Sequence, residues 1–114
     1  MGLEKIADET IYNILLNVME MDEMTVKLAY GEISLDDDLN VLNSSGLPNP
    51  YYNKVQENAL RLMKEYPKEY KKQTSSYLMT QIITSPIKQF RKFLYLRKIT
   101  KDYKKKKKEK SRHE

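Results

Sequence analysis

Basic residues crowd the last quarter of this chain. Thirteen lysine or arginine residues stand between Lys88 and Arg112, against three acids in residues 88–114. Side chains of this type bind polyanions, because they replace the counterions that surround nucleic-acid phosphates. The candidate phosphate contacts are Lys88, Arg91, Lys92, Arg97, Lys98, Lys101, Lys104, Lys105, Lys106, Lys107, Lys108 and Lys110. We expect their binding to weaken with salt and to tolerate many nucleotide sequences.

The basic segment could instead bind an acidic protein partner or serve as a solubilising tail, and both alternatives stay open. Aromatic residues interleave with the cations, and stacking of bases on aromatic rings adds to charged grooves that bind single strands. Phe90 and Phe93 share an apolar arc and are expected in the core. Tyr103, beyond the expected helix end, is the plausible exposed stacking residue.

The aspartates Asp36–Asp38, with Asn40, are the cluster that invites a calcium or magnesium site. An EF-hand loop starting at Asp36 needs glycine at its sixth position and glutamate at its twelfth. Val41 and Leu47 stand at these positions instead. We therefore expect a solvated acidic turn that repels nucleic acid or docks on the basic helix of a neighbouring copy, and no metal.

Residues suited to catalysis are sparse. The only histidine, His113, lies in a tail expected to be mobile, where it cannot hold the geometry of a base or a ligand. Cysteine is absent, and the three glycines are too scattered to form a phosphate-binding loop. We expect no catalytic residue, no cofactor and no enzyme activity.

Charge is sorted along the chain. Residues 1–50 carry ten acids against two lysines, a net charge of −8, whereas residues 88–114 carry a net charge of +10. Residues 51–87 have a net charge of +3. Only the basic end can approach phosphates, so this distribution favours a nucleic-acid contact over catalysis.

Apolar spacing predicts the elements that position these residues, beginning with a helix whose stripe runs from Leu3 to Val18. Asp22 and Thr25 leave open whether this helix continues to Ala29, and Gly31 ends it in either case. Residues 33–42 alternate as a short acidic β-hairpin, and residues 43–50 hold the asparagine, glycine and proline of a loop.

Three further helices are expected after the loop. The second covers about residues 51–66, and Pro67 separates it from a third over about 68–83. Ser85-Pro86 is a strong start signal for a fourth helix, from Pro86 to about Tyr103. The expected fold is therefore mainly α, with a helical oligomerising domain over residues 1–103 and a disordered basic tail over 104–114.

The composition favours self-association. Mean hydropathy is −0.76 and 39% of residues are hydrophobic, so a small core gains from burial between copies. The fourth helix is apolar on more than one side, which is typical of a helix with more than one neighbour. No apolar run approaches the roughly 20 residues of a membrane span, and the acidic N-terminus is unlike a signal peptide. We expect a cytoplasmic homo-oligomer.

The middle of the chain shows an ordered series of motifs. An acidic, weakly extended segment precedes Gly46-Leu47-Pro48-Asn49-Pro50; a helix with Val55, Ala59, Leu62 and Met63 follows, then Tyr66-Pro67 and Thr74-Ser75-Ser76. This series, over about residues 10–78, resembles small subunits of tailed-phage DNA-packaging terminases. The family's Gly-Leu-Thr-Pro-Ser stretch and its proline-rich N-terminal arm are absent. The resemblance implies a ring-forming, non-catalytic adaptor that binds viral DNA in the host cytoplasm and presents it to a large ATPase/nuclease subunit.

The leading hypothesis is a non-enzymatic nucleic-acid-binding adaptor, with viral genome packaging as the role that the resemblance implies. The alternative is a protein-interaction module, an inhibitor or scaffold, whose helix over Leu3–Val18 binds a partner. Attachment to a membrane surface through Phe90, Phe93, Leu94 and the lysine run is the least favoured hypothesis.

Overall fold

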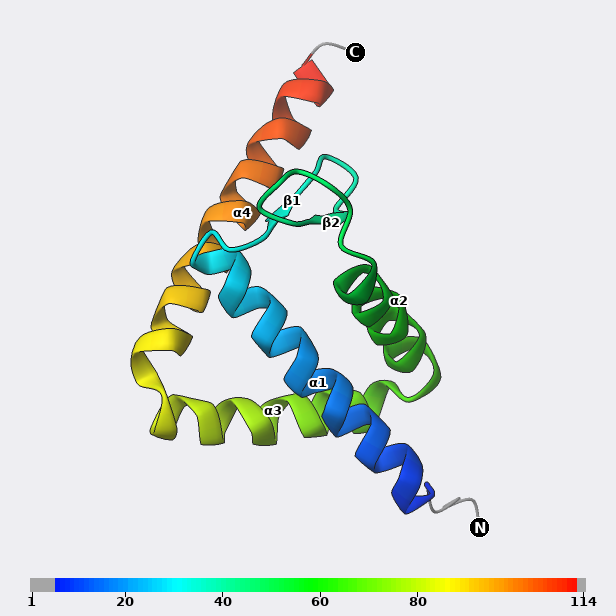
Figure 1. The fold of residues 1–114 in the computed structure, drawn as a ribbon. Helices are drawn as coiled ribbons and strands as arrows, with labels where there is room; N and C mark the ends of the chain where they lie inside the picture. The colour runs from blue at the N-terminus through cyan, green and yellow to red at the C-terminus, as the bar shows by residue number, and fades with distance from the viewer. Residues whose placement is uncertain (1–5, 113–114) are drawn as a thin grey trace.

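The computed structural model describes residues 6–112 of the chain, and it is mainly helical with one short hairpin. The elements are α1 (Asp8–Ala29), β1 (Ser34–Leu35), β2 (Val41–Leu42), α2 (Pro50–Glu65), α3 (Pro67–Thr84) and α4 (Pro86–Arg112). Helix α1 packs against each of the other three helices (Figure 1). The expected fold class is confirmed. Leu3, at the start of the expected first stripe, and His113 lie outside the described residues.

Helix α1 continues without a break through Asp22 and Thr25 to Ala29. It ends in a Schellman motif, in which the Glu32 N–H donates to the Lys27 carbonyl (3.0 Å) and the Gly31 N–H to the Leu28 carbonyl (3.1 Å). Gly31 has a φ of +77°, a left-handed conformation that glycine adopts without a steric penalty. Gly31 therefore ends α1, as the sequence predicts.

The hairpin forms where alternation predicts it, with Ser34 opposite Leu42 and Leu35 opposite Val41. The Asp36 carboxylate organises its turn, because Oδ1 accepts hydrogen bonds from the backbone N–H groups of Asp38 and Asn40, both at 2.9 Å. These bonds favour the ionised form, and the Asn40 backbone bond is the main reason that the pKa of Asp36 lies below its ordinary value.

Two apolar clusters hold the helices together. The first joins the C-terminal half of α1 to the hairpin and the start of α2, and it contains Met24, Leu28, Ile33, Val41, Tyr52 and Val55. The second joins the first half of α1 to α2 and α3, and it contains Ile14, Val18, Ala59, Leu62 and Tyr70. The buried positions of α1 thus follow the predicted stripe.

Helix α4 packs with a polar face inward, which the sequence does not predict. Its buried side chains are Gln89 and Lys92, whereas Phe90 and Phe93 are 61% and 59% exposed, so their expected place in the core is wrong. The cause is Asp22 of α1: Lys92 Nζ lies 2.5 Å from its carboxylate, and Gln89 Nε2 donates to both carboxylate oxygens (3.1 and 3.2 Å). A carboxylate in a packed interface needs such partners, and they turn this face of α4 toward α1.

Helix α4 also extends beyond its expected end near Tyr103, through the lysine run to Arg112. Lysine has a good intrinsic helix propensity, and cations in the last turns of a helix interact favourably with its dipole. The residues expected as a disordered tail from 104 are therefore helical as far as residue 112.

Candidate nucleic-acid interface

The exposed cations of α4 form the candidate interface. Ten of the predicted contacts are exposed: Lys88, Arg91, Arg97, Lys98, Lys101, Lys104, Lys105, Lys106, Lys107 and Lys108. Lys92 does not contribute, because its amine is buried against Asp22. The backbone of Lys110 is helical, and its side chain lies outside the described ones.

Six of these cations share one face of α4 between residues 97 and 108. Their spacing places them together, because residues three, four and seven apart lie on one side of a helix. We call this face the basic stripe: Arg97, Lys98, Lys101, Lys104, Lys105 and Lys108. It runs for about 16 Å, at about 1.5 Å per residue. Every member is exposed, so the stripe presents a continuous positive surface.

The stripe lies on the side of α4 away from the hairpin, because its residues are on the opposite side of the helix from those that line the groove with the hairpin. In Figure 1 the last turns of α4 pass the hairpin and continue past it toward the C-terminus. The side of α4 nearest the hairpin instead carries the half-buried Tyr95 and Ile99, which line a groove of about 740 Å³ with Leu28 and Ile33. Burial raises the pKa of Tyr95, so its hydroxyl stays protonated in this groove at neutral pH.

Two contacts tie other α4 cations to the acidic half of the same chain. Lys106 Nζ lies 3.9 Å from Asp37 Oδ1, but both side chains are largely exposed, and such a pair is worth about 0–1 kcal/mol. The Arg91 guanidinium stacks 4.6 Å from the centre of the Tyr30 ring. Neither contact involves the basic stripe. Tyr103 is exposed, as expected, at the edge of the groove that faces the hairpin.

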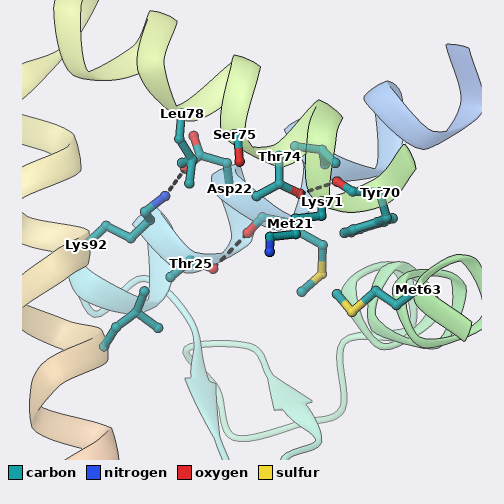
Figure 2. Close-up of a pocket in the computed structure, with 12 residues that line it drawn as sticks. Met21, Asp22, Thr25, Met63, Tyr70, Lys71, Thr74, Ser75, Leu78 and Lys92 are labelled. Carbon is teal, nitrogen blue, oxygen red and sulfur yellow. Dashed lines mark hydrogen bonds and ion pairs between the residues drawn. The ribbon is translucent and has the colours of Figure 1, made fainter. Parts of the chain in front are cut away.

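Figure 2 shows a pocket that is lined by Lys92 and Asp22, among other residues. Met21, Met63 and Leu78 also line it. Its volume is about 290 Å³. The Lys92 nitrogen points at the Asp22 carboxylate, so the two charges neutralise each other and neither is directed at a ligand. Within residues 6–112, no group of three or more histidine, cysteine, aspartate or glutamate side chains could hold a metal ion.

Sequence-based interpretation misses two features of the surface and core. It considers Asp22 as a possible break in the first helix and does not identify Gln89 and Lys92 as its partners, although an acid inside an apolar stripe signals a buried partner. It places Phe90 and Phe93 in the core, although the blurred amphipathicity of their helix indicates a second contact surface. The predicted partner-binding face of α1 is also occupied, because Ile14 and Val18 are buried in the chain's own core.

Comparison with known proteins adds no relative: no family model, curated protein or solved structure matches the chain. Among the helices of the described residues, none combines the length and the apolarity needed to cross a bilayer.

Proposed function

We propose that this chain is a non-enzymatic adaptor that binds double-stranded DNA through the basic stripe of α4. One observation carries this proposal: six exposed cations line one face of a helix, on the side away from the groove between that helix and the hairpin. Such a face neutralises phosphates without any rearrangement of the chain, since its side chains are not committed to the core.

The shape of the helix favours duplex DNA over duplex RNA. The major groove of B-DNA is about 12 Å wide and admits an α-helix, whereas the major groove of A-form RNA is too narrow for side chains to read. A lysine-rich stripe without amide side chains contacts phosphates, so we propose binding with little sequence preference.

The more specific part of the proposal is a role in viral genome packaging. It rests on the resemblance of residues 10–78 to terminase small subunits. In that role the chain brings viral DNA to a large ATPase/nuclease subunit. The helical core around α1 then serves as the body from which α4 reaches the DNA.

The test is a comparison of two variants that lose the same charge at different places. In the stripe variant, Lys101, Lys104, Lys105 and Lys108 are each replaced by glutamine, which keeps a good helix propensity. In the control variant, the exposed lysines Lys64, Lys68, Lys71 and Lys72 of α2 and α3 are replaced in the same way. Fluorescence anisotropy with a labelled 20-base-pair duplex of arbitrary sequence measures the affinity.

We expect the stripe variant to bind about a hundredfold more weakly than the wild type, because each lost phosphate contact costs severalfold in affinity at moderate salt. The control variant should lose far less. Equal losses in the two variants would show that overall charge, and not the stripe, governs binding. Tighter binding to a single strand or to duplex RNA of the same length would contradict the choice of duplex DNA.

A further inference from the structure

Large apolar side chains are exposed around the corner where α3 meets α4. We call this set the apolar corner: Met79, Ile82, Ile83, Ile87, Phe90, Phe93 and Leu94, with exposed fractions from 45% to 77%. All lie within about nine residues of Ser85, or roughly two and a half helical turns. Met79, Ile82 and Ile83 share one side of α3, and the other four share one side of α4, so each helix presents a group of apolar side chains and not scattered single residues.

The area of the apolar corner is that of an interface. A large side chain covers about 150–250 Å², so seven side chains at these exposures present about 700 Å². The largest apolar patch on a typical monomer measures about 300–600 Å², and a standard interface buries about 800 Å² per partner. The apolar corner is thus large enough to be a protein–protein interface. One partner surface of ordinary interface size is sufficient to bury it.

A second exposed stripe lies on α1, on the side opposite its buried residues. Tyr12, Leu16 and Met19 follow one another at helical spacing, and Glu9 and Glu23 extend the same face at its two ends. We call these five residues the α1 face; it is about 21 Å long. Its apolar centre and acidic ends differ in charge from the corner, which is flanked by the exposed cations Lys88 and Arg91.

The charges that flank each surface indicate which surface of a second copy binds the apolar corner. Two corners placed against each other would bring their flanking cations together, and like charges in an interface cost several kcal/mol. The α1 face instead carries the exposed acids Glu9 and Glu23, opposite in sign to the cations beside the corner, although Glu23 also lies 3.3 Å from Lys27 of its own chain. In Figure 1 the N-terminal half of α1 lies at the end of α3 away from the corner. Met19 and Glu23 instead line a pocket with Ser85 and Lys88 of the same molecule, so only the part of the α1 face before Met19 is far from the corner.

We infer that a second copy of this chain covers the apolar corner with its α1 face. The contact is heterologous, since it joins two different surfaces, and it repeats from copy to copy to give a closed ring or a filament. It uses the residues of α4 before Arg97 and leaves the exposed basic stripe free in every copy. This inference is independent of the proposed DNA binding, although an assembly would multiply the stripes that one DNA molecule meets.

Two variants, each lacking one surface, test this contact. Phe90→Asp places a charge in the apolar corner, and Leu16→Asp places one in the α1 face. Light scattering on nuclease-treated full-length protein, at several concentrations and without DNA, gives the mass of each variant and of their equimolar mixture. Leu60→Asp is the matched control, because Leu60 is exposed on α2 and belongs to neither surface.

We expect the wild type and Leu60→Asp to exceed the monomer mass of 13.6 kDa, and each of the other variants alone to be monomeric. Their mixture should form a dimer that grows no further, since only one intact corner and one intact α1 face remain.

Circular dichroism checks that each variant is folded, and Ile83→Asp repeats the test of the corner if Phe90→Asp unfolds. A monomeric wild type would overturn the inference, and co-sedimentation of that monomer with anionic vesicles would assign the corner to lipid. A dimer of Leu16→Asp alone would equally overturn it.

Discussion

Asn17 joins three helices through its amide. Its Nδ2 donates to the Val55 carbonyl of α2 (3.2 Å), and its Oδ1 accepts from the Tyr70 hydroxyl of α3 (2.6 Å). Both side chains are buried, so each depends on the other for its hydrogen bond. A single polar residue in the apolar stripe of α1 therefore fixes how α2 and α3 sit against it.

Replacing Tyr70 by phenylalanine tests this network. The Asn17 oxygen would lose its partner, at a cost of about 1–3 kcal/mol in the free energy of unfolding at pH 7. Burial raises the pKa of Tyr70 to about 12, whereas the hydroxyl of the unfolded chain ionises near 10. The protonated hydroxyl thus stabilises the fold fully below pH 10, and this contribution disappears as the pH rises from 10 to 12.

We therefore expect the stability of the wild type to fall more steeply between pH 9 and pH 11 than that of Tyr70→Phe. The difference should be about 1 kcal/mol, measured by urea denaturation at each pH. Identical pH profiles for the two proteins would show that Tyr70 does not hold its proton in the fold.

At the level of the elements, the sequence predicts where the helices begin better than which side of α4 is buried. Pro50, Pro67 and Pro86 each stand at the first position of a helix, and Gly31 follows α1, so local chemistry marks these boundaries. The hairpin follows from alternation in the same way. These signals act over a few residues and need no knowledge of the tertiary fold.

The inward face of α4 could not be found in this way. Its hydrophobic pattern points to Phe90 and Phe93, but the packing is decided by Asp22, which is 67 and 70 residues away from Gln89 and Lys92 in the sequence. The same limitation explains the candidate site. Composition alone is enough to find Arg97 to Lys108, whereas Lys92 belongs to the interface with α1 for a reason that only the tertiary structure provides.

The Asp22–Lys92 pair should accordingly contribute to docking of α4 and not to DNA binding. Asp22→Ala leaves a buried ammonium group without its partner, and we expect it to lower the free energy of unfolding by about 3 kcal/mol. The double variant Asp22→Leu/Lys92→Met removes both charges and should recover most of this loss, since apolar residues of similar volume replace buried ion pairs well.

Urea denaturation of the wild type, the single variant and the double variant measures these differences. A loss below about 0.5 kcal/mol for Asp22→Ala would mean that the pair is as weak as an exposed one.

In the whole molecule, acids and cations that are far apart in the sequence come close together, because the hairpin lies beside α4. Among the described side chains, the hairpin acids pair only with Lys106 of α4, through an exposed contact, and the basic stripe lies on another side of the helix. Gln89 and Lys92 attach α4 to α1. We propose two further roles for the same helix: the apolar side chains near Ser85 would bind a second copy, and the basic stripe would bind DNA. The acidic half does not cancel the positive surface that DNA binding requires.

The salt dependence of duplex DNA binding tests this account most directly. With six phosphates contacted by the basic stripe, the logarithm of the binding constant should fall with the logarithm of salt concentration at a slope of about −5. The stripe variant, with four of its six cations removed, should give a slope of about −2. A slope near zero for the wild type, or the same slope for the wild type and the stripe variant, would contradict the claim that this face of α4 holds the DNA backbone.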